Sequence, residues 1–269
     1  MAPLISVIIP VRNGAAYIEK AVSSALSQTT QASQIIVSDN GSTDATAALL
    51  SKYEDDPRIK VVRQTGQFDM FAHFNKCLEM VDTKYFMMLH HDDFLCDESA
   101  LEQALAIMES SPSLSTVYCD LVYVDKMGKF INHRQFNRAG IVNADEIAKQ
   151  SVLSTRNLFG IPLLIRSDSM KSVKYDNRIT YAADLEFSIA VAKCGEILYI
   201  RKPLIAYRIH GENASVSLFR LAFEQMKLIA LKHGISINAL ERVEMYLRAW
   251  MVAFQKWAYF QYLNKVRKY

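Results

Sequence analysis

The stretch Tyr85-Phe86-Met87-Met88-Leu89-His90-His91-Asp92-Asp93 passes directly from an apolar run to two adjacent carboxylates. The apolar part predicts a buried strand, and the carboxylates fall where that strand ends. Two charged carboxylates in such a place need a positive group beside them, and a divalent cation that carries a diphosphate is one such group. Aspartate is also common at helix N-caps and in solvated turns, so this stretch alone leaves a metal site and a turn both open.

Length and composition describe a folded globular protein. The chain has 269 residues, 51% of them hydrophobic and 22% charged, which fits one large α/β domain or a domain with a helical appendage. The net charge of +3 is mild, and basic residues gather only at the last few positions, so a nucleic-acid partner is not indicated. The four cysteines include no Cys-x-x-Cys pair, which argues against a zinc or redox motif.

The first half of the chain alternates short apolar runs with segments of helical spacing. Residues 5–9, 35–37 and 59–62 read as buried strands, and residues 15–26 and 43–50 read as helices. Strands that are apolar on both faces, separated by helices, predict a mostly parallel central sheet flanked by helices.

Polar clusters follow three of the predicted strands. They are Pro10–Asn13, Asp39–Ser42 and His90–Asp93. Ligands of parallel α/β sheets bind beyond the carboxyl ends of the strands, so we expect the clusters to converge on one crevice. No Gly-x-Gly-x-x-Gly follows the first strand and no Gly-Lys-Ser/Thr loop is present, which disfavours a classical dinucleotide fold and a P-loop.

The second half is less regular. A helix is expected over 101–108, strands near 116–118 and 197–200, and a helix that starts near Asp184. Residues 128–156 have weak periodicity and are expected to form acceptor-facing loops and short helices. From residue 218 the pattern is helical to the end, with a break at Gly234.

Four motifs in order carry a resemblance to a known family. They are Ser6-Val7-Ile8-Ile9-Pro10-Val11-Arg12-Asn13, Ile36-Val37-Ser38-Asp39-Asn40-Gly41-Ser42-Thr43-Asp44, Leu89-His90-His91-Asp92-Asp93 and Ala182-Ala183-Asp184-Leu185-Glu186-Phe187, with Tyr207-Arg208-Ile209-His210 as a fifth. Over about residues 4–217 the chain resembles the family 2 glycosyltransferases, which share the GT-A fold. The resemblance implies a catalytic domain at 1–217, with a nucleotide-binding half at about 1–95 and an acceptor-binding half at about 96–217. Residues 218–269 then form a C-terminal helical extension.

The resemblance also implies roles for single residues. Asp184 is implied as the general base of an inverting transfer, and Asp93 as the ligand of Mn²⁺ or Mg²⁺, with His210 a second metal candidate. Asp39 is implied to accept a hydrogen bond from the base imide, which favours a UDP- or dTDP-sugar donor. Asp92 is implied at the ribose or diphosphate. The other implied donor-site residues are Pro10, Val11, Arg12, Asn13, Asn40 and Asn75.

Two departures from the family pattern leave alternatives open. His90 stands where many members have an acidic residue, and it can ligate a metal or pack against the strand end. Ala183 stands where many members have glutamate before the catalytic aspartate. A non-catalytic nucleotide-sugar-binding subunit is therefore an alternative, and a sugar nucleotidylyltransferase is another, although residues 11–14 lack that class's glycine-rich loop.

The expected activity is metal-dependent transfer of a sugar to a hydroxyl of a glycan or lipid-linked acceptor, which the resemblance connects with bacterial cell-surface polysaccharide synthesis. No apolar run approaches the ~20 residues that span a bilayer, and the N-terminus lacks a signal-peptide pattern, so we expect a cytoplasmic protein or one peripheral to the inner face of the membrane. In the C-terminal segment aromatic and basic residues alternate. This pattern predicts a peripheral membrane contact, a homodimer contact or packing on the catalytic domain. The residues concerned are Trp250, Phe254, Trp257, Tyr259, Phe260 and Tyr262 with Arg248, Lys256, Lys265, Arg267 and Lys268.

Overall fold

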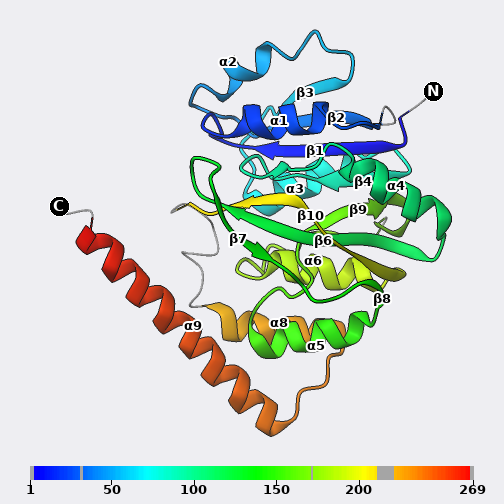
Figure 1. The fold of residues 1–269 in the computed structure, drawn as a ribbon. Coiled ribbons are helices and arrows are strands. Elements are labelled where there is room, and N and C mark those ends of the chain that lie inside the picture. The colour runs from blue at the N-terminus through cyan, green and yellow to red at the C-terminus, as the bar shows by residue number, and fades with distance from the viewer. Residues whose placement is uncertain (1–2, 31–32, 171, 211–220, 267–269) are drawn as a thin grey trace.

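A single large sheet runs through the molecule (Figure 1). The computed structural model describes residues 3–30, 33–170, 172–210 and 221–266, with only the backbone for 252–253 and 255–266. The strand order is β3-β2-β1-β4-β9-β6-β10-β5, with β7 beside β6 and β8 beside β10. The strands are β1 Ile5–Val11, β2 Ser33–Asp39, β3 Ile59–Arg63, β4 Tyr85–Met88, β5 Phe94–Leu95, β6 Leu114–Val124, β7 Phe130–Arg134, β8 Gly140–Val142, β9 Pro162–Arg166 and β10 Glu196–Arg208.

The N-terminal half of the sheet is parallel, as the sequence predicts. Strand β1 pairs in parallel with β2 and with β4, and β2 pairs in parallel with β3. All seven residues of β1 are buried, because helices cover both of its faces. Ile5, Val7 and Ile9 point into one core, whereas Ile8 points into another. The carboxyl ends of β1, β2 and β4 therefore lie at one edge.

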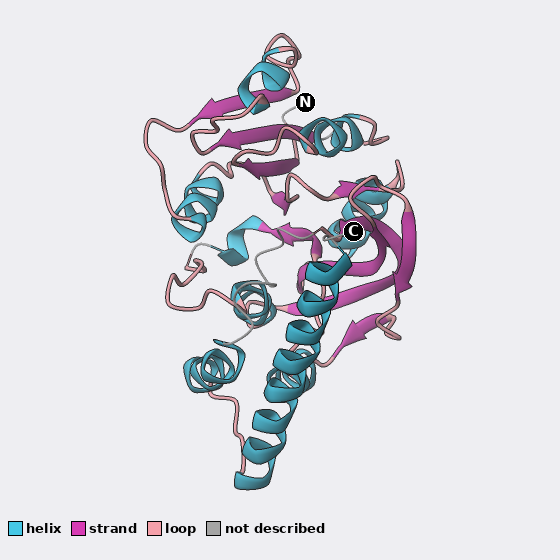
Figure 2. Ribbon diagram, turned by 90° about the vertical axis from the view of Figure 1, so that its left-hand side faces the viewer, coloured by secondary structure: helices cyan, strands magenta, loops and turns pink. Residues whose placement is uncertain are grey.

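Helices cover both faces of the sheet (Figures 1 and 2). Helices α1 (Ile18–Leu26), α2 (Thr46–Ser51) and α4 (Ala100–Ser110) pack on the face that holds Val7 and Ile9. On the opposite face lie α3 (Met70–Glu79) and α6 (Ala183–Ala192). The mixed α/β class with a central sheet flanked by helices is thus confirmed.

The C-terminal half of the sheet is mixed. Strand β9 runs antiparallel to both β4 and β6, whereas β6 and β10 pair in parallel. The expectation of only loops and short helices for residues 128–156 is wrong, because the segment holds β7, β8 and the eleven-residue helix α5 (Ala144–Ser154). Strand β7 is mostly exposed, so its residues need no alternation of apolar and polar side chains.

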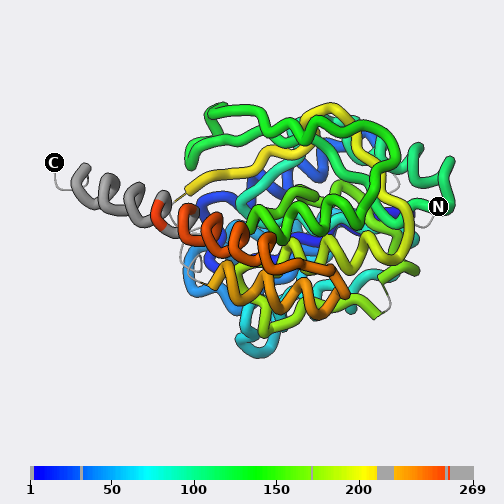
Figure 3. The backbone as a smooth tube through the Cα atoms, turned by 90° about the horizontal axis from the view of Figure 1, so that it is seen from below, coloured from blue at the N-terminus to red at the C-terminus, as the bar shows by residue number. Residues whose placement is uncertain are grey.

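The C-terminal helices cross the underside of the molecule (Figure 3). Helix α8 (Ala222–His233) ends at Gly234, whose φ of +69° suits glycine, and α9 spans Ala239–Val266. Met226 of α8 and Met245 of α9 are buried in one core with α5 and α6. The expected boundary between residues 217 and 218 lies outside the described residues.

Helix α9 leaves an apolar face exposed. Trp250 and Phe254 are 60% and 53% exposed and stack on each other with ring centroids 5.7 Å apart. More than half of each of these two rings is therefore exposed. Trp257, Tyr259, Phe260, Tyr262 and the basic residues from Lys256 onward lie outside the described side chains. Among the described helices none is long and apolar enough to cross a membrane.

Candidate active site

The polar segments after β1 and β2 are joined directly by hydrogen bonds. The Asn13 amide N–H donates to Ser42 Oγ at 2.8 Å, and Asn13 Oδ1 accepts from the Thr43 amide at 2.8 Å. The Asn40 amide donates to the Val11 carbonyl at 2.9 Å. Asn13 adopts a φ of +53°, a conformation that asparagine tolerates better than most residues. The structure thus brings the first two polar clusters together, as the sequence predicts.

Asp39 and Asn40 organise this edge. Asp39 is 4% exposed, and its Oδ1 accepts hydrogen bonds from the amide and the hydroxyl of Ser42 at 2.9 and 2.6 Å. The Asn40 side chain exchanges hydrogen bonds with the backbone of Phe68 at 2.9 and 3.0 Å. Arg12 donates to Gln67 at 3.3 Å. The loop before α3 is thereby held against the ends of β1 and β2.

Three predicted donor-site residues use their side chains elsewhere. Pro10 and Val11 are buried in the sheet, so only their backbone can face a ligand. Asn75, on α3, donates to the Tyr175 carbonyl at 3.0 Å and accepts from the Tyr175 amide at 2.8 Å. By contrast, Arg12 and Asn13 are exposed at the carboxyl edge.

The two histidines after β4 make packing contacts. The His90 ring lies edge-on to Phe74, with centroids 5.3 Å apart. His91 lies so close to Gly14 that a Cβ there would be 2.6 Å from His91 Cδ2 and 2.5 Å from Val11 Cγ2. Burial lowers the pKa of His91 despite the neighbouring Asp92 charge. The contact at Gly14 joins the third polar cluster to the first.

Asp92 and His210 form a pair between β4 and the end of β10. Asp92 Oδ2 and His210 Nε2 are 2.9 Å apart, and the His210 ring packs on Tyr17 with centroids 5.3 Å apart. Burial opposes ionisation of Asp92, but the charges of His90 and His91 and the hydrogen bond from His210 outweigh it and lower the pKa of Asp92. The Asp92 and His210 side chains are 18% and 12% exposed, so both are partly accessible from outside.

Asp93 faces the interior. It is 4% exposed, and its Oδ1 accepts a hydrogen bond from the Arg208 amide at 2.9 Å. Burial, and then the charge of Asp92, raise the pKa of Asp93 well above its ordinary value. Arg208 donates from Nε to the Asp92 carbonyl at 2.8 Å, so β10 is attached to this loop at two points. In this arrangement Asp93 holds two strands together and Asp92 faces the site.

Asp184 lies in the first turn of α6, where the helix dipole favours a carboxylate. Its Oδ2 accepts a hydrogen bond from Asn157 Nδ2 at 3.0 Å. It lines a cavity of about 580 Å³ between β6, β10, α6 and the end of α5, together with Tyr207. Burial raises the pKa of the Tyr207 phenol, and the carboxylates that raise it further are those of Asp93, Asp92 and Asp184. Tyr207 therefore lies within electrostatic reach of all three carboxylates.

Glu186, two residues after Asp184, points away from the cavity, as its helical position predicts. Its Oε1 pairs with Lys232 Nζ at 2.8 Å and His233 Nε2 at 3.0 Å, and the residue is 1% exposed. Burial opposes ionisation, but the hydrogen bonds from His233 and Lys232 outweigh it and lower the pKa of Glu186. These contacts join α8 to α6. The sequence offers no local signal for them.

Among the described residues no three His, Cys, Asp or Glu side chains come together as a metal cluster. Asp92 and His210 supply a carboxylate oxygen and an imidazole nitrogen, both of which suit Mn²⁺. Two protein ligands fit a cation whose other positions are taken by a diphosphate and water, as is usual for metals held with nucleotides.

Comparison with known proteins gives the family. The model of the glycosyl transferase family 2 matches residues 6–175, and the chain belongs to that family. An uncharacterized glycosyltransferase of Rickettsia bellii is 29% identical over 217 residues, and the chondroitin synthase of Escherichia coli is 26% identical over 215 residues. The matches cover 79% and 80% of this chain but only 31% and 30% of those proteins, so the chain spans about a third of their length.

Solved structures share the fold. S. aureus TarS 1–349 in complex with UDP-GlcNAc has a TM-score of 0.71 at 18% identity, over 91% of this chain and 70% of that one. A mannosyltransferase from Pyrobaculum calidifontis, in complex with GDP-Man and Mn²⁺, has a TM-score of 0.60 at 14% identity, over 93% of this chain and 69% of that one. The protein is therefore a family 2 glycosyltransferase of GT-A type.

Proposed function

We propose that this protein transfers a sugar from a UDP- or dTDP-sugar to a hydroxyl of a glycan or lipid-linked acceptor, with inversion at the anomeric carbon. The observation that carries the proposal is that Tyr207 lines the cavity together with Asp184 and is also within electrostatic reach of Asp92, which pairs with His210. One end of this site suits a diphosphate, and the other holds a carboxylate free to take a proton. The edge formed by Asn13, Asp39 and Asn40 is the proposed place of the nucleoside, and the UDP-GlcNAc bound to TarS supports a uridine donor.

We assign the metal to Asp92 and His210, in place of the earlier expectation for Asp93. Asp93 is buried and accepts from the Arg208 amide, whereas Asp92 is partly exposed and lies beside the His210 nitrogen, a second candidate ligand. A bound Mn²⁺ or Mg²⁺ would stabilise the negative charge that develops on the diphosphate leaving group. His90 and His91 support this loop by packing.

Asp184 is the proposed general base. An acceptor hydroxyl becomes an effective nucleophile when a base within hydrogen-bond reach removes its proton as the new bond forms. The hydrogen bond from Asn157 orients the carboxylate toward the cavity and leaves its other oxygen for the acceptor. A single carboxylate on the side opposite the leaving group gives displacement with inversion.

The cellular role and location are proposed as well. We propose a role in bacterial surface polysaccharide synthesis at the cytoplasmic side of the membrane. The exposed Trp250 and Phe254 rings support a contact of α9 with the membrane surface or with a second copy of the chain. Both contacts stay predictions.

The proposal is tested with a panel of nucleotide sugars. The purified chain is incubated with each donor and Mn²⁺, and nucleoside diphosphate release is measured with and without chelator. We expect metal-dependent release from a uridine or thymidine donor, and at least a tenfold loss in Asp92→Asn. Asp145→Asn is the control, because Asp145 is an exposed aspartate in the first turn of α5. Nucleotide binding without turnover of any donor would instead support a non-catalytic binding subunit.

A further inference from the structure

The cavity beside Asp184 carries an excess of positive charge. Its charged lining residues are Arg134, Arg156 and Asp184. No ion pair among the described residues includes either arginine. Arg134 donates to two neutral oxygens, the Tyr123 hydroxyl at 3.1 Å and the Asn157 carbonyl at 2.5 Å. These bonds fix the position of the guanidinium but do not neutralise its positive charge.

Arg156 is placed at the cavity by the way α5 ends. Thr155 follows the helix in the left-handed conformation, with a φ of +56°, and the Arg156 amide donates back to the Ser151 carbonyl at 3.1 Å. Glycine is the usual residue at such a helix end, and a β-branched residue there is strained. Arg156 is exposed and lines the cavity, with no carboxylate partner among the described residues.

Thr155 adds an independent observation. It lines the same cavity and is 1% exposed, yet its hydroxyl has no hydrogen-bond partner among the described residues. Buried hydroxyls are nearly always hydrogen-bonded, because leaving one unpaired is unfavourable. A strained backbone and an unpaired hydroxyl at one position are typical of a binding site.

We infer that the acceptor is acidic, and that Arg156, with Arg134 and the Thr155 hydroxyl, binds a carboxylate or phosphate group of the acceptor beside the hydroxyl that is glycosylated. This inference rests on the proposed function and adds the class of acceptor. The guanidinium suits both anions, because it presents paired N–H donors to two oxygens. The Asn157 contacts with Arg134 and Asp184 connect the anion site to the general base.

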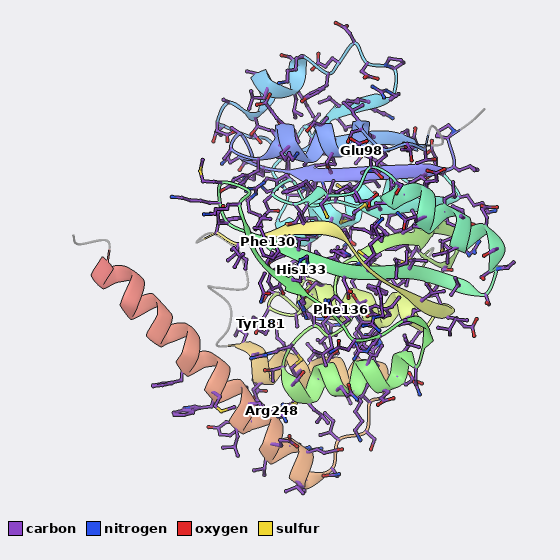
Figure 4. The ribbon with its side chains drawn as sticks, in the orientation of Figure 1. Glu98, Phe130, His133, Phe136, Tyr181 and Arg248 are labelled. Carbon is purple, nitrogen blue, oxygen red and sulfur yellow. The ribbon has the colours of Figure 1, made fainter. Side chains whose placement is uncertain are left out.

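The region can be followed in Figure 4. The labelled Tyr181 and Phe136 lie between the sheet and the lower helices α5 and α8. Tyr181 lines the cavity, whereas the Phe136 ring fills the space where Gly160 would carry a Cβ, 2.6 Å from its Cζ. Gly160 also lines the cavity, with a φ of +94°. Aromatic rings and a glycine-lined wall beside two arginines suit a sugar ring that bears a charge.

The test compares matched acidic and neutral compounds on the full chain by ligand-observed NMR, with UDP and Mn²⁺ present. Methyl β-D-glucuronoside and methyl β-D-glucoside differ in a carboxylate, and glycerol 3-phosphate and glycerol differ in a phosphate. We expect the acidic member of at least one pair to bind about threefold to tenfold more tightly, because the arginine is partly exposed. The preferred pair identifies the anion as a carboxylate or a phosphate.

Three variants make the test specific. Arg156→Gln should remove the preference for the acidic compound, and Arg201→Gln, an exposed arginine outside the cavity lining, should retain it. Thr155→Val keeps the side-chain shape but removes the hydroxyl. A purely structural hydroxyl without a partner predicts an unchanged preference, whereas our inference predicts at least a twofold loss with the thermal midpoint retained.

The inference is overturned if neither acidic compound binds better than its neutral partner, or if Arg156→Gln keeps the preference. It is also overturned if Arg156→Gln weakens UDP binding, which would place the arginine at the donor. Failure of the proposed function is a separate result. In that case no nucleotide sugar is turned over, while the preference for the acidic compound is still measured by binding alone.

Discussion

Replacing Asp93 with alanine tests which of the adjacent aspartates is structural. Asp93 is 4% exposed and accepts the Arg208 amide at 2.9 Å, so the alanine variant leaves a buried N–H without a partner. An unsatisfied buried donor costs about 1–3 kcal/mol. For a domain of this size each kcal/mol lowers the thermal midpoint by about 2–4 °C. A loss of about 2 kcal/mol therefore predicts a midpoint lower by about 4–8 °C.

The matched variants are Asp93→Asn and Asp92→Asn, measured by scanning calorimetry and by titration of UDP with Mn²⁺. Asp93→Asn keeps an acceptor for the Arg208 amide, so it should lose less than half as much stability as Asp93→Ala and still bind UDP with metal. Asp92→Asn gives up the favourable charge interactions that lower the pKa of Asp92, so its midpoint should also fall, but it alone should lose at least tenfold in metal-dependent UDP affinity. Our assignment is refuted if Asp93→Asn unfolds like the wild type and no longer needs metal to bind UDP.

Other parts of the structure make further predictions. Gly14→Ala places a Cβ against Val11 and His91, so we expect a loss of about 1–3 kcal/mol in the free energy of unfolding and weaker UDP binding, measured by denaturant titration and calorimetry. Because the pKa of Glu186 is lowered, its contribution to stability is complete above its ordinary pKa of 4.5 and is lost as the pH falls through the lower folded value. Glu186→Gln should therefore unfold at a lower temperature than the wild type at pH 7, with the gap closing as the pH falls below 4.5. A constant gap over that range would show that the pairing with Lys232 does not depend on the Glu186 charge. Finally, a chelator should abolish donor turnover without changing the thermal midpoint measured in the absence of nucleotide.

The parallel half of the fold is predictable because its signals are local. Apolar runs such as Ile5–Ile9 are followed by polar residues at the strand ends, and parallel strands bring those ends to one edge. The motif around Asp184 is recognisable for the same reason, since it combines a helix start with an apolar helix. Strand β7 was missed because a short, mostly exposed strand leaves no comparable pattern. Strand β9 does contain a short apolar run, Leu163–Ile165, but a run of that length does not distinguish a strand from a buried helical segment.

The choice between Asp92 and Asp93 depends on distant contacts. Adjacent residues at a strand end point in different directions, but the sequence does not say which direction is the interior. The answer comes from β10, whose Arg208 amide reaches Asp93 and whose neighbour His210 reaches Asp92. These partners are 115 and 118 residues away in the chain, so no local spacing reveals them. The helix end at Thr155 and Arg156 was likewise not predictable from the sequence, because its strain is visible only in the backbone conformation of Thr155.

The most direct test of the proposed site is the transfer rate of Asp184→Asn with the best donor and acceptor of the panels at saturation, compared with Asp145→Asn. A general base contributes about 10²–10⁴-fold to the rate. We predict that Asp184→Asn transfers at least 100-fold more slowly while its UDP affinity and thermal midpoint stay unchanged, and that Asp145→Asn behaves like the wild type. Transfer by Asp184→Asn at the wild-type rate would contradict the assignment of this cavity as the catalytic site.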